Sequence, residues 1–508
     1  MYSLCRGLIA YSFSLLFTLV YGYWAAKDKI AERLLIPLLD ILQSIPVLGF
    51  MPGLILALVA LFPHSNIGLE LAAILMIFTG QVWNMTFSFY HSLRSIPSDL
   101  REAGTLYRFH WWQTFKWIEL PFSMMGLVWN SMMSMAGGWF FLMISEAFVL
   151  GNRDFRLPGI GSYMSVAVAT GNVSAMIYAV IAMMLMIVLL DQLLWRPVVV
   201  WAQKFRVEEG SRGTEMKSWF LDWLRSIGSS RFARMWKVWR TRNAKPATTH
   251  PVESTESAKS AKYFGNVIFL IVLIALVLGV YKLLQLLKGI SFHEWQTLLI
   301  SALLTLGRVL LSTGLATLWT VPAGLAIGLS PKLSRALQPV VQVVASFPAP
   351  MLFPVVIALL YVAGVSIGWG SIVLMLLGTQ WYVLFNVIAG AMFIPSDLRE
   401  VSEIYHVSGF QRFIKLYLPA IFPYLVTGWI TAAGGAWNAS IVSEFVSFKG
   451  KTIAAWGIGA EISKAADSAN FPLLAASIVV MSAIVVLFNR TVWKKCYALA
   501  ETRYSLSK

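Results

Sequence analysis

Long apolar stretches, each about the length of a membrane-crossing helix, alternate with short polar segments along most of the chain. A helix needs roughly 20 mostly apolar residues to cross the hydrocarbon core of a bilayer, and it tolerates Pro and Gly there. Eleven stretches meet this requirement: 4–26, 38–62, 67–93, 121–145, 172–195, 264–287, 301–328, 339–364, 368–392, 419–445 and 470–493. The pattern predicts an all-α polytopic membrane protein with about eleven transmembrane helices.

The composition agrees with a lipid-facing surface. Of the 508 residues, 58% are hydrophobic and 13% are charged, whereas soluble domains average about 45–50% apolar and about 25% charged residues. A net charge of +16 would suggest nucleic acid in a soluble protein. Here the charges lie between apolar stretches, so we expect the lipid bilayer and no nucleic acid as the partner of this surface.

The basic segments set the orientation, because short cytoplasmic loops carry an excess of Lys and Arg. The strongly basic segments are 27–33, 94–119, 196–262, 329–335, 398–415 and 494–508. Threading the predicted helices through the membrane places all of them on one side. We therefore expect that side, with the C-terminus, to be cytoplasmic.

The chain contains two copies of one unit. The sequence Ile-Pro-Ser-Asp-Leu-Arg-Glu occurs at 96–102 and again 298 positions later, at 394–400. The same offset pairs Trp83 with Trp381, Trp139 with Trp437, Glu146 with Glu444, and 159–161 with 457–459, while an offset of 302 pairs Pro46 with Pro348. Both copies have the same predicted orientation, so the repeat is parallel, about an axis along the membrane normal.

The repeat divides the chain into a first repeat unit at 1–203, a basic cytoplasmic linker at 204–262 and a second repeat unit at 263–508. Basic residues and tryptophans alternate at 231–245, which favours an amphipathic helix on anionic lipid over a partner-binding segment. The stretch at 264–287 has no counterpart in the first unit. We therefore expect a further N-terminal helix, which mass spectrometry of the native N-terminus would test.

The repeated heptapeptide opens a polar loop in each unit. The loops at 95–121 and 393–419 begin with Pro-Ser-Asp, mix charges with aromatic residues and close with Leu-Pro. Ser98 or Asp99 is expected to cap a short helix, and Glu102 has the spacing of a capping box, as do Asp397 and Glu400. A helix–turn–helix in each loop, present in two copies about a twofold axis, suits a symmetric partner.

These loops resemble the EAA loop of ABC-importer permeases, whose pattern is Glu-Ala-Ala, a Gly, and then Ile-x-Leu-Pro. The residues of the two loop motifs are Ser98, Asp99, Arg101, Glu102, Ala103, Gly104, Leu120 and Pro121, and Ser396, Asp397, Arg399, Glu400, Leu418 and Pro419. Val401 and Ser402 replace the two alanines in the second copy. The Gly of the pattern is Arg108 in one copy and His406 in the other, which is a departure at the turn.

The resemblance covers nearly the whole chain outside 196–262 and is strongest to the nitrate/sulfonate/taurine group, here fused in tandem. It implies the permease subunit of a type I ABC importer in the bacterial inner (plasma) membrane. Two cytosolic ABC ATPase subunits would receive the loops, and a periplasmic binding protein would deliver a small anionic solute. ATP and Mg²⁺ would belong to the ATPase: at 450–452 the phosphate-loop pattern lacks its earlier Gly. The chain itself is then expected to be no enzyme and to carry no cofactor.

Polar or aromatic residues inside the apolar stretches are candidates for a solute pathway or gate, because polar groups are costly in lipid. They are Gln81, Asn84, Trp139, Ser145, Glu146, Gln380, Asn386, Trp437, Asn438, Ser443 and Glu444. The alternative for each is a helix–helix hydrogen bond. An anionic solute fits poorly with a carboxylate ligand, which favours a gating role for Glu146 and Glu444. The histidines show no ligand spacing, so no metal site is predicted.

Two other classes of function remain open at this point. An ion-coupled secondary transporter also uses repeats, but it usually has carboxylates in the middle of the membrane, and Asp191 is the nearest case. A membrane scaffold could use the basic linker. Dependence of transport on an ATPase would separate these classes.

Overall fold

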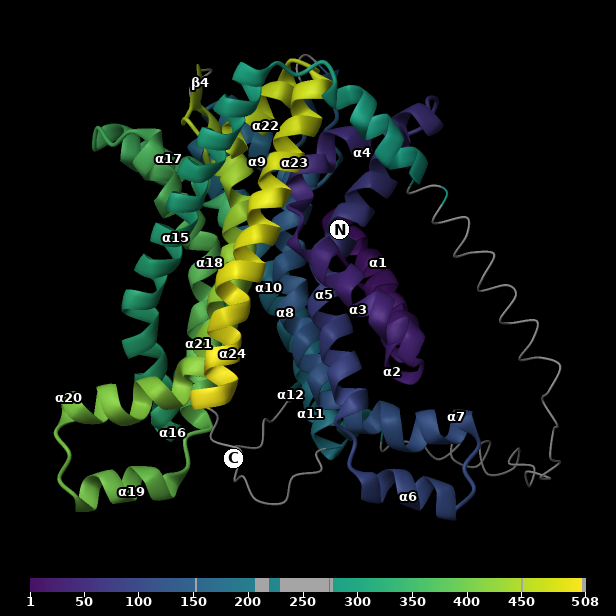
Figure 1. Ribbon diagram of the computed structural model, residues 1–508, viewed down its shortest axis with the longest axis vertical. Coiled ribbons are helices and arrows are strands. Elements are labelled where there is room, and N and C mark those ends of the chain that lie inside the picture. Colours follow the sequence, from purple (N-terminus) through teal and green to yellow (C-terminus); the bar gives the residue numbers. More distant parts are fainter. Residues whose placement is uncertain (151–152, 206–218, 229–273, 275–276, 449–450, 505–508) are drawn as a thin grey trace.

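The structure is a computed structural model that describes residues 1–150, 153–205, 219–228, 274, 277–448 and 451–504. These residues are almost all helical (Figure 1). Eight helices among them are long and apolar enough to cross a membrane: Tyr2–Lys27, Ile67–Arg94, Trp111–Glu146, Val173–Phe205, Phe292–Leu329, Ile367–Met392, Gly409–Ser443 and Phe471–Ala500. The all-α polytopic prediction is confirmed. The basic stretch at 231–245 and the beginning of the stretch at 264–287 lie outside the described residues.

The elements follow the same order in both repeats. The first has α1 (Tyr2–Phe17), η1 (Thr18–Gly22), α2 (Tyr23–Lys27), α3 (Lys29–Ser44), α4 (Val47–Leu61), α5 (Ile67–Arg94), α6 (Ser98–Leu106), α7 (Trp111–Thr114), η2 (Phe115–Glu119), α8 (Leu120–Glu146), β1 (Val149–Leu150), β2 (Arg153–Asp154), α9 (Ile160–Ala169), α10 (Val173–Leu190), η3 (Asp191–Trp195), α11 (Arg196–Ala202) and η4 (Gln203–Phe205). The helix α12 (Trp219–Gly228) lies within the predicted linker.

After a short apolar helix at Val277–Leu287, the second repeat continues the series. It has α15 (Phe292–Leu329), α16 (Pro331–Ser346), η5 (Ala349–Met351), α17 (Phe353–Val362), α18 (Ile367–Met392), α19 (Ser396–Ile404), α20 (Gly409–Arg412), η6 (Phe413–Tyr417), α21 (Leu418–Ser443), β3 (Phe445–Phe448), β4 (Lys451–Ala454), α22 (Ile458–Asp467), α23 (Phe471–Phe488), η7 (Asn489–Trp493) and α24 (Lys494–Arg503).

One membrane crossing in each repeat is interrupted. The sequence predicts continuous helices at 38–62 and 339–364, but the structure divides the first between α3 and α4 and the second between α16 and α17. The residues before Pro46 and Pro348 are extended, with ψ of 124° and 127°, because a proline disfavours the helical conformation of the residue before it. In Figure 1, α4 and α17 lie nearer the upper end than α3 and α16, so each pair forms one broken crossing.

The interrupted crossings lie where the repeats meet. α3 and α4 pack against α23, and α4 also against α21, while α16 packs against α8 and α10 and η5 against α8. Irregular backbone is tolerated at membrane depth only where protein buries it or where it lines a water-filled cavity. Each repeat therefore covers the break of the other.

The two ends of the molecule differ in kind. At the upper end of Figure 1, the antiparallel hairpins β1–β2 and β3–β4 are each followed by a short helix, α9 or α22. The registers pair Val149 with Asp154 and Phe445 with Ala454. The hydropathy pattern predicts no elements in these two loops. At the lower end, α6 and α19 lie across the direction of the long helices.

The turn that follows α9 and α22 offers a matched test of backbone strain. Gly171 has φ +65° and Ala469, 298 positions later, has φ +53°. A left-handed conformation costs an L-residue about 1–2 kcal/mol, and the extra freedom of an unfolded glycine offsets about 0.5–1 kcal/mol of this. We expect Ala469→Gly to stabilise the protein by about 0.5–1 kcal/mol and Gly171→Ala to destabilise it by a similar amount.

Unfolding of the purified protein in detergent measures both changes. A Cβ at Gly171 would meet no atom within 4 Å, and the same holds at Gly314, inside α15. Gly314→Ala is therefore the control, and it should be neutral or stabilising because Gly disfavours helix interiors. A Gly171→Ala protein as stable as its parent would contradict the strain argument.

Candidate functional site

The repeated loop motif lies on two short helices at the lower end of the molecule. α6 and α19 have nine residues each, and each lies beneath its own repeat (Figure 1). Glu102 and Glu400 are exposed. Arg101 turns back toward α5, and its Nη2 lies 3.3 Å from the carbonyl oxygens of Leu93 and Arg94. Arg101 therefore ties the loop to its membrane helix, while the glutamates face solvent.

Both short helices begin without the predicted side-chain caps. The N-cap positions are Pro97 and Pro395, and neither helix start has a side-chain cap hydrogen bond. The predictions of a Ser98 or Asp99 cap and of capping boxes were therefore wrong. Extended proline residues lead directly into the helices, and Asp99 and Asp397 lie in the first turn, where the helix dipole favours a carboxylate.

The turn after each short helix is left-handed at a residue that is not glycine. Arg108 has φ +51° and His406 has φ +46°. The next residue donates its N–H to a carbonyl five positions earlier, over 2.9 Å in the first repeat and 3.0 Å in the second, which is a bond of the Schellman motif. Each loop thus forms a left-handed turn without a Gly at this position, at a strain of about 1–2 kcal/mol in each copy.

The Leu-Pro that closes each motif lies inside a continuous helix. α7 continues through η2 into α8, and α20 continues through η6 into α21. Both η2 and η6 are π-helical and end within two residues of Pro121 or Pro419. A proline lacks an N–H and its ring clashes with the carbonyl four residues earlier. The wider π turn is where each helix accommodates these two effects.

Each short helix also ends in an exposed apolar pair that the sequence analysis missed. Leu106 and Tyr107 are 82% and 76% exposed, and Ile404 and Tyr405 are 73% and 76% exposed. The offset of 298 relates the two pairs, and this was the signal that could have revealed them. Exposed apolar groups of this kind are typical of protein–protein contacts.

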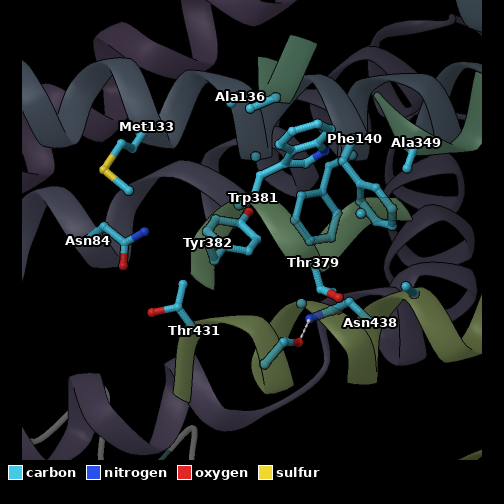
Figure 2. A pocket seen from close by; sticks show the side chains of 18 of the residues that line it. Asn84, Met133, Ala136, Phe140, Ala349, Thr379, Trp381, Tyr382, Thr431 and Asn438 are labelled. Atoms are coloured by element: carbon cyan, nitrogen blue, oxygen red, sulfur yellow. Dashed lines mark hydrogen bonds between the residues drawn. The ribbon is translucent and has the colours of Figure 1, made fainter. Parts of the chain in front are cut away.

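A cavity of about 170 Å³ lies between the two repeats (Figure 2). Its walls come from α5 and α8 of the first repeat, α18 and α21 of the second, and both helix breaks. Its lining residues all belong to the described chain, and none carries a charge at neutral pH. A solute in this space would meet polar but uncharged side chains.

The two halves of the cavity share a backbone plan but differ in chemistry. Gly80 and Gly378 are an identical pair of lining residues, and Trp83 and Trp381 are another. The equivalent lining positions that differ and include a polar side chain are Gln43 and Ala345, Asn84 and Tyr382, Met133 and Thr431, and Phe140 and Asn438. Of these, only Asn84 and Asn438 were predicted as pathway candidates. A lone Gln, Thr or Tyr in an apolar stretch gives no signal of where it faces.

Asn438 joins the two repeats at a helix break. Its Oδ1 accepts a hydrogen bond from the N–H of Leu48, over 3.3 Å. Its Nδ2 donates to the Gly434 carbonyl, over 3.2 Å. Leu48 lies in the first turn of α4, which has no side-chain cap, so the amide satisfies one of the backbone donors that a helix start leaves free.

Other predicted pathway residues lie outside the lining of this cavity. Gln81 is buried, and its Nε2 lies 3.3 Å from a methionine sulfur of α8. Gln380 accepts an indole N–H from α15, and Asn386 donates to a carbonyl of its own helix. Trp139 and Trp437 are buried in the hydrophobic core. These five side chains make hydrogen bonds to helices or fill the space between helices.

Glu146 and Glu444 also lie outside the cavity, at the centres of two matching buried networks. Glu146 accepts hydrogen bonds from Ser3 Oγ (3.0 Å), Arg6 Nη1 (2.6 Å) and the N–H of Gly161 (2.9 Å). The carboxylate therefore joins three elements, α1, the end of α8 and the start of α9. A Cβ at Gly159 would overlap this carboxylate.

The second repeat rebuilds the same network. Glu444 accepts from Thr305 Oγ1 (2.8 Å), Arg308 Nη1 (2.8 Å) and the N–H of Gly459 (2.9 Å). A Cβ at Gly457 would overlap it, so the repeated Gly-Ile-Gly serves a close approach to the glutamate in both copies.

The two networks differ at the arginine. Arg6 also forms a two-pronged ion pair with Glu70, over 2.6 and 2.7 Å. Gly368 stands 298 positions after Glu70, and a Cβ there would lie 3.4 Å from Arg308 Nη2. In the described chain, Arg6 therefore pairs with two carboxylates and Arg308 with one.

A second cavity, of about 650 Å³, adjoins the first. The two linings meet at consecutive residues, Val47 with Leu48 and Ala349 with Pro350. α9 and α22 supply much of the wall of this second cavity. The cavities are therefore stacked along the interface between the repeats. Within the described ranges, no three His, Cys, Asp or Glu side chains converge as a metal site would require.

These features define a class of protein, a duplicated multi-pass membrane permease with one exposed loop helix per repeat and a cavity between the repeats. The chain belongs to the family described as binding-protein-dependent transport system inner membrane component, whose model matches residues 18–194 and 320–492. The double match confirms the tandem permease fusion that the repeat and the loops predict.

Curated relatives fall in the group that the loops resemble. The chain is 27% identical to the nitrate import permease protein NrtB of Synechocystis sp. over 37% of its length. It is 30% identical to the bicarbonate transport system permease protein CmpB of the same organism over 30% of its length, and 24% identical to the taurine transport system permease protein TauC of Escherichia coli over 38%. The matches span 64%, 51% and 66% of these relatives.

The buried networks predict a difference in stability between the repeats. Removing one partner of a buried ion pair costs about 3–5 kcal/mol, because a charge is left without compensation. Glu444→Ala should show this full loss, since it leaves Arg308 without a carboxylate. Glu146→Ala should cost less, since Glu70 remains paired with Arg6.

Thermal unfolding in detergent measures both variants. The control is Glu403→Ala, whose carboxylate is 68% exposed beside Arg412 and should matter by less than about 1 kcal/mol. If Glu444→Ala lowers the stability no more than this control does, the buried networks do not stabilise the protein as the geometry indicates.

Proposed function

We propose that this chain is the permease subunit of an ATP-driven importer, and that its two repeats together form the path of one small anionic solute. The observation that carries the proposal is the duplicated loop. Each copy presents an exposed glutamate and an exposed apolar pair on a short helix at one end of the molecule. Two equivalent docking points suit a pair of ATPase subunits, which would bring the ATP and Mg²⁺ sites.

The membrane arrangement supports an assignment of sides. α6, α19 and the end of α24 lie at the same end of the molecule (Figure 1), and the loops that carry α6 and α19 are among the basic segments. The excess of Lys and Arg favours the cytoplasm for this end. The opposite end, with the hairpins and the larger cavity, would then face a binding protein outside the inner membrane.

The relatives support an anionic solute. The names of three of them refer to nitrate, bicarbonate and taurine, and each of these solutes carries an oxyanion or a sulfonate. The cavity between the repeats contains no carboxylate in its lining, so nothing there repels an anion. We keep Glu146 and Glu444 as proposed gate residues. Their proposed role is to hold the helix ends together at the end opposite the loops, not to contact the solute.

The first test is retention of the ATPase. We expect an ATPase encoded beside this chain to co-purify with it, and to be lost when Glu102→Lys and Glu400→Lys are combined, because both docking charges are then reversed. Quantification of the ATPase in pull-downs from membranes measures this. The matched control is Asp154→Lys, a charge reversal of an exposed residue in β2, outside both loops.

Retention of the ATPase by the double variant would refute the docking assignment. Transport that persists in ATP-depleted proteoliposomes would instead indicate an ion-coupled secondary transporter. The same preparations serve both measurements.

The two docking points are also expected to be unequal. A Cβ at Gly104 would lie 2.9 Å from Ile118 Cδ1, whereas at the equivalent position the Oγ of Ser402 donates to the Arg399 carbonyl, over 2.7 Å. Identical ATPases would thus meet two different surfaces. Glu102→Lys and Glu400→Lys, made singly, should reduce ATP-dependent uptake to different extents, and equal losses would count against the difference.

A further inference from the structure

Asn84 and Tyr382 occupy one equivalent position in the two repeats, 298 residues apart on α5 and α18. Both side chains line the cavity between the repeats (Figure 2). The two repeats therefore carry different polar groups at the same equivalent position. A solute on the axis between the repeats would meet an amide from one side and a phenol from the other.

Most other polar groups of the lining are already occupied. Thr79, Thr379 and Thr431 each donate a hydroxyl hydrogen to a carbonyl of their own helix, over 2.7 to 3.0 Å. Asn438 makes the two bonds described above.

The Asn84 amide and the Tyr382 hydroxyl are different, because neither has a hydrogen-bond partner within the part of the chain that the structure describes. A polar group left without a partner away from water costs about 1–3 kcal/mol, and intramembrane polar groups are typical of solute pathways. The two groups are therefore available to a ligand.

The free groups of the cavity are mainly donors. A Tyr hydroxyl and an Asn amide can both donate, and an indole N–H can only donate. Trp83 and Trp381 add two such indoles to the lining, and neither N–H has a partner in the described ranges. A ligand that satisfies these groups must bring acceptors, and charged acceptors form the stronger bonds.

The cavity also limits the size and the residence of its ligand. Its volume of about 170 Å³ is below the roughly 300–1,000 Å³ of sites for drug-sized molecules. With no cationic side chain in its lining, it has no fixed charge to trap an anion. Binding that is favourable enough to admit an ion but weak enough to release it is what a transport path requires.

We propose that Asn84 and Tyr382 are the specificity-determining pair of this cavity, and that they hold a small monovalent oxyanion or sulfonate through neutral hydrogen-bond donors. The proposal rests on the proposed import function, since it assumes that the solute passes between the repeats. It adds the residues and the chemistry of recognition within the membrane.

The test uses the complete complex of this chain, its ATPase and its binding protein in proteoliposomes, with ¹⁵N-nitrate, ¹⁴C-bicarbonate and ³H-taurine as probes. Uptake is measured with saturating binding protein and is normalised to the amount of assembled complex. Asn84→Leu should lower the maximal rate roughly tenfold, as expected for loss of a hydrogen bond to a charged group. Asn84→Asp should lower it further, because it sets a negative charge against the anion. Tyr382→Phe, which removes only the hydroxyl, should also reduce the rate.

The control pair is Asn130→Leu and Asn130→Asp. Asn130 is a half-buried asparagine of α8 outside the cavity lining, and its Nδ2 donates to the Gly126 carbonyl, over 3.0 Å. A purely structural asparagine should tolerate Asp, which keeps its shape and can still form a hydrogen bond, no worse than Leu, in either place. The ordering of parent above Asn84→Leu above Asn84→Asp, absent at Asn130, is therefore the signature of anion coordination.

Two results would overturn the proposal, and they differ. If the parent complex accumulates a probe in an ATP-dependent manner and Asn84→Asp matches it, the import function stands and the specificity pair is wrong. If the parent complex accumulates none of the three probes, the proposed import function itself fails, and this inference fails with it.

Discussion

A helix that is interrupted inside a membrane must have its free backbone groups covered by protein or water, because lipid offers no hydrogen bonds. Pro46 and Pro348 impose such an interruption on one crossing of each repeat. The two breaks are consequently held against helices of the other repeat, and the central cavity lies between them. The bond from Leu48 to Asn438 shows the constraint at atomic scale, since an amide of one repeat completes the helix start of the other.

Duplication supplied the framework, and divergence supplied the chemistry. Many of the residues that the repeats share meet a requirement of backbone geometry or packing, such as the prolines at the breaks and the glycines beside Glu146 and Glu444. The cavity, in contrast, sets Asn84 against Tyr382 and Phe140 against Asn438. If one solute passes along the internal axis, as proposed, each position there would face its own copy, and an asymmetric solute would be matched best by unequal partners.

The two ends of each repeat are built for different degrees of rigidity. At the end that bears the hairpins, buried carboxylates with three hydrogen-bond donors each hold the first helix against α8 and α9, or against α21 and α22. At the opposite end, α6 and α19 connect through left-handed turns at Arg108 and His406 and then through π-helical segments. Strained turns and π segments occur often at switch regions and functional sites, so the end with α6 and α19 has the local structure better suited to movement.

The sequence by itself determined the membrane class, the tandem repeat, the loop motif and the family, because each is a matter of local composition or of spacing along the chain. Only the tertiary structure decided what the polar residues do. In the sequence, Glu146 and Glu444 suggested gates in an apolar stretch. In the structure, each is enclosed by an arginine that lies far away in sequence and by a glycine N–H 15 positions further on. Pro46 and Pro348 were visible as a pair, but that they break the helices beside the central cavity depends on packing between the repeats. Which side of a helix faces lipid, a neighbour or a cavity is set by contacts between distant segments, and no local pattern carries that information.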